Sequence, residues 1–223
     1  MYEIEAYHGT NRLRGERIIA NEQIELSIGD NHWLGDGSYF FEDDLYAYKW
    51  CVDMFYNRYK EYYTYNHLIE EYMILRASIK TEQSRIFDLT HLEGKSIFDI
   101  TYKNLMVMAE YSEKFKNYEI ADGVVINYLF KELGYSYSYD VVRAVFIKYK
   151  NNYRGIKTRQ GFVCETQLCI KNINVIDKIY EYNFDSKVSK YESIWNNLIN
   201  IDSMYKEKNT YNKYKAYRTG YKL

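Results

Sequence analysis

The stretch from Leu34 to Cys51 places a tight turn, an aromatic run and a helical pattern in immediate succession. Gly35 and Gly37 bracket the turn, and the four residues that follow are expected to be extended. An acidic cluster at 42–44 then offers a helix N-cap and negative charge for the first helical turn. Apolar residues recur at helical spacing from about residue 44 to 62, which predicts a buried stripe made of Ala47, Trp50, Cys51, Met54 and Phe55.

Further patterns predict strands and helices that do not alternate regularly. Alternation of polar and apolar residues, or short apolar runs, indicates strands at residues 3–7, 23–28, 72–79, 87–89, 141–149 and 162–170. Helical spacing indicates helices at about 12–21, 102–117 and 191–198, whereas the segment after Asp122 and Gly123 fits either a strand or a helix. We therefore expect an α+β fold with antiparallel or split sheets rather than a doubly wound parallel sheet.

The composition narrows the class of protein. The 223 residues, 47% of them apolar, are enough for one domain with a hydrophobic core. The cysteines Cys51, Cys164 and Cys169 form no CxxC pair, so we expect buried, reduced thiols and neither a disulfide framework nor a metal site. The N-terminus lacks the basic and apolar regions of a signal peptide, and no run of about 18 apolar residues is present. These features predict a cytoplasmic protein without a membrane segment.

Charge is distributed unevenly along the chain. Residues 203–223 contain six basic residues and one acidic residue, although the net charge of the whole chain is −1. Five tyrosines are interleaved with the basic residues. Such a tail suits a nucleic-acid partner, because lysines bind phosphates and aromatic rings stack on bases, but a frayed or surface-packed terminus would have the same composition. We expect two parts, a domain at 1–180 and a C-terminal helix with the basic tail at 181–223.

Single aromatic residues carry little information in this chain, which has 28 tyrosines and no proline. A genome of low GC content, bacterial or phage, would explain this bias. A tyrosine is therefore a candidate for stacking on a ligand only where other residues point to the same site.

A few residues combine the features that bind a planar ring and ribose hydroxyls. His8 ends the first predicted strand and Gly9 follows it, so a side-chain donor and an unshielded backbone amide come side by side. Tyr39 follows the glycine turn, and Glu165 and Gln167 are two residues apart in a predicted strand, so their side chains share a face. Each also has a plain structural explanation, as a strand-end histidine, a core aromatic residue or an outward-facing polar residue.

The segment from Gly35 to Trp50 resembles the G-x-G-x-Y-F signature of the His-Tyr-Glu branch of the ADP-ribosyltransferases, and His8-Gly9-Thr10 is similar to the first motif of that branch. The resemblance implies an ADP-ribosyltransferase-like fold, with split antiparallel sheets flanked by helices. It also implies that His8 binds the adenosine ribose of NAD, Gly9 binds the nicotinamide carboxamide and Tyr39 stacks on the nicotinamide. The NAD-binding residues implied in this way are His8, Gly9, Thr10, Gly37, Ser38, Tyr39 and Trp50.

The third motif departs from the pattern of the branch. Residues 165–170 resemble the late strand that carries the catalytic glutamate, but Gln167 occupies the position of that glutamate and Glu165 lies two residues earlier. Ala47 stands where some members have a serine that holds the carboxamide. The catalytic candidates are therefore His8, Tyr39, Glu165 and Gln167, and the sequence leaves open whether Glu165 or Gln167 has the catalytic role.

The resemblance implies a mono-ADP-ribosyltransferase that uses NAD as its substrate and needs no metal. We expect a toxin or phage-defence effector with an antitoxin or immunity partner, and the basic tail favours nucleic acid over protein as the acceptor. Two alternatives keep the fold. The protein could be an NAD-binding or partner-binding module without transferase activity, because Gln167 replaces the glutamate. It could also be an NAD glycohydrolase, with water as the acceptor.

Overall fold

The computed structural model describes residues 2–29, 32–110, 121–150 and 162–203. The chain forms two compact units, and we describe each by itself. The first unit combines Met1–Val145 with Thr166–Tyr182, and the second combines Phe146–Glu165 with Asn183–Leu223. Glu165 and Gln167 belong to different units.

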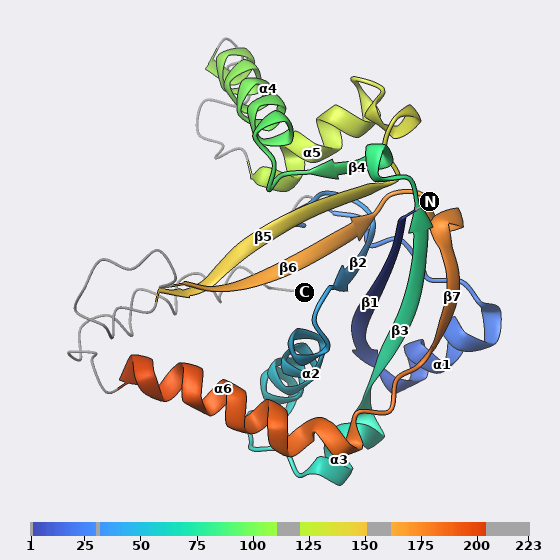
Figure 1. The fold of residues 1–223 in the computed structure, drawn as a ribbon, viewed down its shortest axis with the longest axis vertical. Helices are drawn as coiled ribbons and strands as arrows, with labels where there is room; N and C mark the ends of the chain where they lie inside the picture. The colour runs from blue at the N-terminus through green and yellow to red at the C-terminus, as the bar shows by residue number, and fades with distance from the viewer. Residues whose placement is uncertain (1, 30–31, 111–120, 151–161, 204–223) are drawn as a thin grey trace. The chain divides into compact units, whose positions relative to one another are not determined.

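One seven-stranded sheet carries the described strands in the order β4-β5-β6-β2-β1-β3-β7 (Figure 1). Its strands are β1 (Tyr2–Asn11), β2 (Ser38–Phe41), β3 (Tyr72–Thr81), β4 (Ile86–Asp88), β5 (Val141–Lys150), β6 (Phe162–Ile170) and β7 (Ile176–Glu181). The pairing of β4 with β5 is parallel, whereas β1–β2, β1–β3, β2–β6 and β3–β7 are antiparallel. The expected α+β class with a mostly antiparallel sheet is confirmed.

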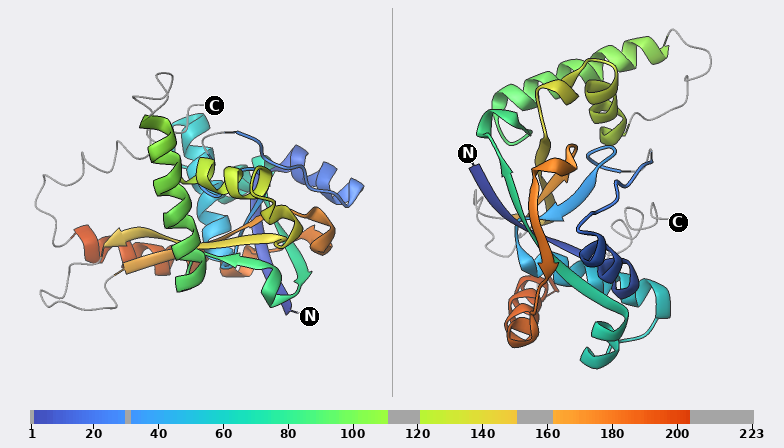
Figure 2. Two further views of the ribbon diagram at one scale, coloured as in Figure 1. Left: turned by 90° about the horizontal axis from the view of Figure 1, so that it is seen from above. Right: turned by 90° about the vertical axis from the view of Figure 1, so that its right-hand side faces the viewer.

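Six helices accompany the sheet in the described residues: α1 (Arg12–Asn21), α2 (Asp44–Tyr59), α3 (Tyr65–Glu71), α4 (Leu92–Glu110), α5 (Asp122–Lys131) and α6 (Val188–Ser203). The ambiguous segment after Asp122 is therefore a helix. The predicted helix at 102–117 begins ten residues earlier than expected, and its part at 111–117 lies outside the described residues, as does the basic tail after Ser203. Helices α4 and α5 pack on each other, and α4 also packs on β4 (Figures 1 and 2).

The two faces of the sheet in the first unit are covered by different helices. Directly opposed residues of antiparallel strands point to the same face, so the register assigns each side chain. On the face that we call the α1 face, Ala6, Phe40 and Leu168 are fully buried in the main apolar cluster, together with Ile18 of α1. Tyr7, Gly9, Phe41, Tyr39 and Gln167 lie on the opposite face, which we call the α2 face because α2 packs on it at Gly9.

Two expectations from the sequence are wrong. The strand predicted at 23–28 does not form, and only an isolated bridge joins Ser27 to Gly37. Ile24 is buried, but Leu26 is 42% exposed and Ile28 is 76% exposed, so the alternating residues do not form one buried face. Both edges of β1 are already occupied by β2 and β3, so this segment cannot pair with β1. The expectation that all three thiols are buried also fails, because Cys164 is exposed.

Candidate functional site

The candidate site lies where β1 and β2 meet. These strands share a single pair of opposed residues, Tyr7 and Phe41, whereas β1 and β3 share ten. Next to this pair, a side chain connects the two strands: Nδ1 of His8 in β1 lies 2.7 Å from the carbonyl oxygen of Tyr39 in β2. One opposed residue pair and the His8 imidazole therefore link β2 of the half β4-β5-β6-β2 to β1 of the half β1-β3-β7. We call this junction the seam.

The imidazole of His8 is neutral at physiological pH. Burial lowers the pKa of His8 to about 4, the carbonyl of Tyr39 opposes this shift, and the charge of Arg14 adds to it. A neutral ring that donates from Nδ1 to a carbonyl keeps Nε2 as an acceptor. His8 therefore has the protonation state in which it can accept a hydrogen bond from a ribose hydroxyl. Because Tyr7 and Gly9 lie on the α2 face, the side chain of His8 lies on the α1 face, where its ring centroid is 5.5 Å from that of Phe40.

Gly9 permits the closest approach between α2 and the sheet. A Cβ atom at this position would lie 2.8 Å from the carbonyl oxygen of Ala47, 2.8 Å from Cε3 of Trp50 and 3.1 Å from Sγ of Cys51. All three belong to α2, which begins with its N-cap Asp43 accepting a hydrogen bond from the amide of Leu45. The structure thus brings the predicted residues Gly9 and Trp50 into contact, with no room for a side chain at Gly9.

The hydroxyl of Tyr39 binds the glycine turn that precedes it. It donates to the carbonyl oxygen of Gly35 at 2.6 Å and accepts from the amide of Leu34 at 3.0 Å. The ring of His32 meets the Tyr39 ring edge-on, with 5.6 Å between centroids. The orientation of the Tyr39 ring therefore depends on the conformation of residues 34–37, which we call the glycine loop.

Three of the predicted NAD-binding residues have structural partners. Ser38 is buried on the α1 face, where its hydroxyl donates to the carbonyl oxygen of Glu25 at 3.1 Å. Thr10 is buried on the same face, close to the position of Gly15 in α1. A Cβ atom at Gly37 would lie 2.3 Å from Sγ of Cys169 in β6. Gly37 therefore lets the glycine loop approach β6 closely.

Glu165 and Gln167 share one face of β6, as their spacing predicted. Gln167 is opposed to Phe41 and is half-buried on the α2 face, which is also the face of Tyr39. Glu165 is 4% exposed and belongs to the other unit.

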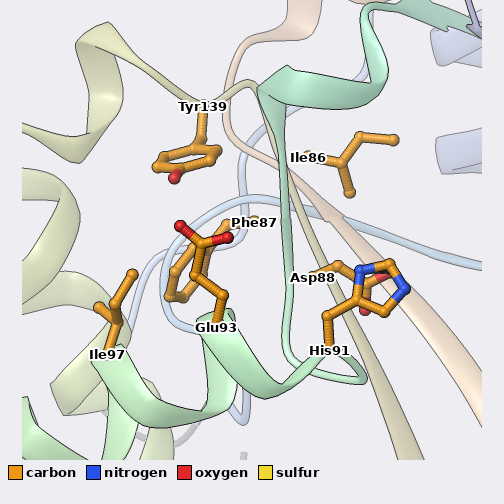
Figure 3. Close-up of a pocket in the computed structure, with 8 residues that line it drawn as sticks. Ile86, Phe87, Asp88, His91, Glu93, Ile97 and Tyr139 are labelled. Atoms are coloured by element: carbon orange, nitrogen blue, oxygen red, sulfur yellow. Dashed lines mark ion pairs between the residues drawn. The ribbon is translucent and has the colours of Figure 1, made fainter.

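Two hollows in the described residues contain none of the predicted site residues. The smaller, of about 70 Å³, is lined by β4, by α4 and by Tyr139, and the carboxylate of Glu93 points toward the Tyr139 ring across it (Figure 3). The larger, of about 460 Å³, is lined by β1, β3 and β7, where charged side chains pair, as Lys80 does with Asp177 at 2.8 Å. We find no group of three or more His, Cys, Asp or Glu residues placed to bind a metal in the described part of the chain.

Comparison with known proteins identifies a relative in an archaeon. The chain is 39% identical over 199 residues to an uncharacterized protein, MJ0359, of Methanocaldococcus jannaschii, covering 83% of this chain and 90% of the relative. The two proteins belong to one family. No family model and no solved structure matches the chain. The archaeal member is itself uncharacterized, so the relationship assigns no activity to this chain.

Sequence reasoning missed the residues that hold the glycine loop in this member of the family. Nζ of Lys171 donates to the carbonyl oxygens of Leu34 at 2.6 Å and Asp36 at 2.5 Å. Asn127 of α5 accepts from the amide of Asp36 at 2.7 Å, and Lys131 binds the Asp36 carboxylate at 2.5 Å. These partners are 91 to 137 residues from the loop in sequence. A local motif contains no signal for them.

None of the helices that the structure describes has the length and apolar character needed to span a membrane.

Proposed function

We propose that this protein is a mono-ADP-ribosyltransferase that uses NAD as its substrate. The observation that carries the proposal is the seam, where Gly9, Tyr39 and Gln167 lie on the α2 face, Trp50 packs on that face at Gly9, and His8 links the two strands from the α1 face. Glycine, two aromatic rings and a polar side chain are the groups that would hold a flat carboxamide ring and the ribose attached to it. The order of these residues along the chain follows the motif order of the His-Tyr-Glu branch.

The fold supports the proposal in a general way. The sheet is mostly antiparallel, and its halves are joined through one residue pair between β1 and β2. An ADP-ribosyltransferase-like fold with split sheets would place the nicotinamide at such a junction. The two predicted motifs that meet at the seam come from residues 7–10 and 34–51, and their contacts at Gly9 and Tyr39 are close.

The proposed reaction breaks the bond between nicotinamide and the ribose of NAD. Nicotinamide leaves with the electron pair of that bond, a nucleophile of the acceptor forms the new bond to the ribose carbon, and the proton of the nucleophile is released. Positive charge develops on the ribose in the transition state, so a carboxylate or amide oxygen near it lowers the barrier. In the proposed mechanism, Tyr39 stacks on nicotinamide, Nε2 of His8 accepts from a ribose hydroxyl, and Glu165 or Gln167 supplies the oxygen.

The proposed biological role is that of a toxin or phage-defence effector with an antitoxin or immunity partner. The proposed acceptor is nucleic acid, which the six basic residues and five tyrosines of 203–223 favour over protein. A protein acceptor is the competing outcome of the test below. The proposal needs no metal.

A binding module is the second candidate, and Gln167 in the position of the catalytic glutamate is the observation that favours it. In that case the seam would bind NAD or a partner without breaking the glycosidic bond. An NAD glycohydrolase would instead release nicotinamide and leave no label on any macromolecule.

Labelled NAD separates these candidates. We expect label in RNA or DNA when the protein is incubated with NAD, total nucleic acid and cell lysate. Label in protein alone would support transfer but refute the proposed acceptor. Nicotinamide release without macromolecular label indicates a hydrolase, and binding of NAD without either product indicates a module. The matched control for a Tyr39→Ala variant is Tyr62→Ala, because Tyr62 is 95% exposed.

A further inference from the structure

Lys171 directly follows β6, and its side chain contacts the glycine loop. Its ammonium group donates to two loop carbonyls, those of Leu34 and Asp36, at 2.6 and 2.5 Å. It also lies 5.2 Å from the centre of the Phe130 ring of α5, a favourable distance for a cation and an aromatic face. A charged group thus links the end of β6 to the loop and to α5.

The loop is fully hydrogen-bonded around this lysine. The amide of Leu34 donates to the Tyr39 hydroxyl, that of Gly35 to the carbonyl oxygen of His32, that of Asp36 to Asn127 and that of Gly37 to the carbonyl oxygen of Ser27, at 2.7 to 3.1 Å. The carbonyl oxygen of Gly35 accepts from the Tyr39 hydroxyl. Each residue from 34 to 36 therefore has at least one bond to Tyr39 or to Lys171.

We infer that Lys171 is a positioning residue, which locks the glycine loop and thereby fixes the Tyr39 ring in the orientation that binds the nicotinamide of NAD. The lock consists of the two bonds from Nζ, and it reaches Tyr39 through Leu34 and Gly35. Lys171 does not touch the substrate in this scheme. The part of the inference that concerns NAD rests on the proposed function, whereas the lock itself does not.

The surroundings of Lys171 explain why a cation is tolerated there. Burial lowers its pKa, whereas Cys169 of β6 and Asp36 of the loop favour the charged form and Lys131 of α5 opposes it. The carbonyls of Leu34 and Asp36 are acceptors only, so an uncharged apolar side chain would leave both without this donor. Bonds from a charged donor are stronger than those between neutral groups.

Lys131→Met is the matched control for Lys171→Met. Both lysines bind Asp36, but Lys131 binds its carboxylate from an exposed position, with 56% of the side chain accessible. An exposed ion pair contributes little to stability. The two variants remove the same charge and differ in whether the donor to the loop carbonyls is lost.

The test measures amide hydrogen exchange by NMR in the absence of NAD, and kcat and KM for NAD separately. We expect the amides of Leu34 and Asp36 to exchange about 10-fold faster or more in Lys171→Met, and to change less than about 3-fold in Lys131→Met. The KM for NAD should rise about 10-fold in Lys171→Met while kcat changes less, because stacking contributes to ground-state binding as well.

Exchange that is unchanged in a folded Lys171→Met variant would overturn the lock, as would equal acceleration in both lysine variants. Faster exchange with an unchanged KM would overturn the link to NAD. Wild-type protein that does not turn over NAD would refute the proposed function, and exchange would still decide the lock. If Lys171→Met does not fold, Tyr39→Phe tests the link between the loop and the ring, because it removes the hydroxyl that binds Leu34 and Gly35. Unchanged exchange at Leu34 in that variant would also overturn the inference.

Discussion

His8→Asn should remove a pH dependence of stability that originates at the seam. In the folded protein the pKa of His8 is about 4, whereas an unperturbed histidine titrates near 6.5. The unfolded chain therefore binds more protons than the folded chain between these pH values, and stability rises with pH across this interval. The contribution is fully present above pH 6.5 and is lost as the pH falls to about 4.

The difference between the two pKa values of His8 corresponds to a change of about 3 kcal/mol in the free energy of unfolding, at about 1.4 kcal/mol for each pH unit. Because His8 retains some exposed area, we treat this value as an upper limit and expect 1 to 3 kcal/mol, roughly. Asparagine places an amide nitrogen near the position of Nδ1, so it retains a donor for the carbonyl of Tyr39 but does not titrate. The variant should therefore be less sensitive than the wild type to acid.

The assay is urea unfolding of both proteins at several pH values from 7.5 to 4.0. The free-energy difference between wild type and His8→Asn should fall by 1 to 3 kcal/mol, roughly, over this range. Asp140, whose pKa is lowered to about 2 chiefly by its hydrogen bond to Arg85, loses its contribution at the acid end of this range in both proteins, so it cancels in the difference. Parallel curves would refute the neutral, buried imidazole at the seam. The same variant lacks Nε2, so a rise in the KM for NAD with retained stability at pH 7.5 would separate its ribose role from its structural role.

The other predictions concern the remaining residues of the proposed site. Tyr39→Ala should lower NAD turnover ~10- to 1000-fold through lost stacking, measured as nicotinamide release, and unchanged turnover in a folded variant would exclude Tyr39 from the site. Gly9→Ala should destabilise the protein by about 1–3 kcal/mol in urea unfolding, because its Cβ would lie 2.8 Å from both a backbone carbonyl and the Trp50 ring; a stability change below about 0.5 kcal/mol would show that α2 can move away. Glu165→Gln should abolish transfer if Glu165 supplies the carboxylate, whereas Gln167→Glu should then leave it within about 10-fold, and the reverse pattern would assign the role to residue 167.

Elements with a local signal could be predicted from the sequence. The bounds of α1 match the expected helix at 12–21, because Asn11 caps it by accepting from the amide of Arg14 at 2.9 Å. Seven of the ten residues of strand β3 are buried, four of them in succession at its start, so the strand has an apolar run that the sequence shows. By contrast, β7 at Ile176–Glu181 buries no residue completely and pairs only with β3, so it has no period-two pattern to detect.

The site was predictable as a set of residues but not as an arrangement. The motifs predict that His8, Gly9, Tyr39 and Trp50 share a site, and the structure brings Gly9 to Trp50 and His8 to the Tyr39 backbone. The motifs did not indicate that Ser38 and Thr10 are buried on the α1 face. For Ser38 that outcome depends on the register of β2 with β6, and for Thr10 on the register of β1 with β2 and β3.

The pairing of β2 with β6 also determines when the site can exist. Ser38 of β2 is opposed to Ile170 of β6, and Lys171 is 137 residues from Leu34 in the sequence. Closing so long a loop costs entropy before any contact is gained, which favours slow folding. During synthesis, β1 and β2 leave the ribosome long before β6, so β2 lacks its partner and the glycine loop lacks its lysine. A nascent chain therefore cannot assemble the seam with its loop, and the proposed consumption of NAD would begin only once translation has passed the end of β6.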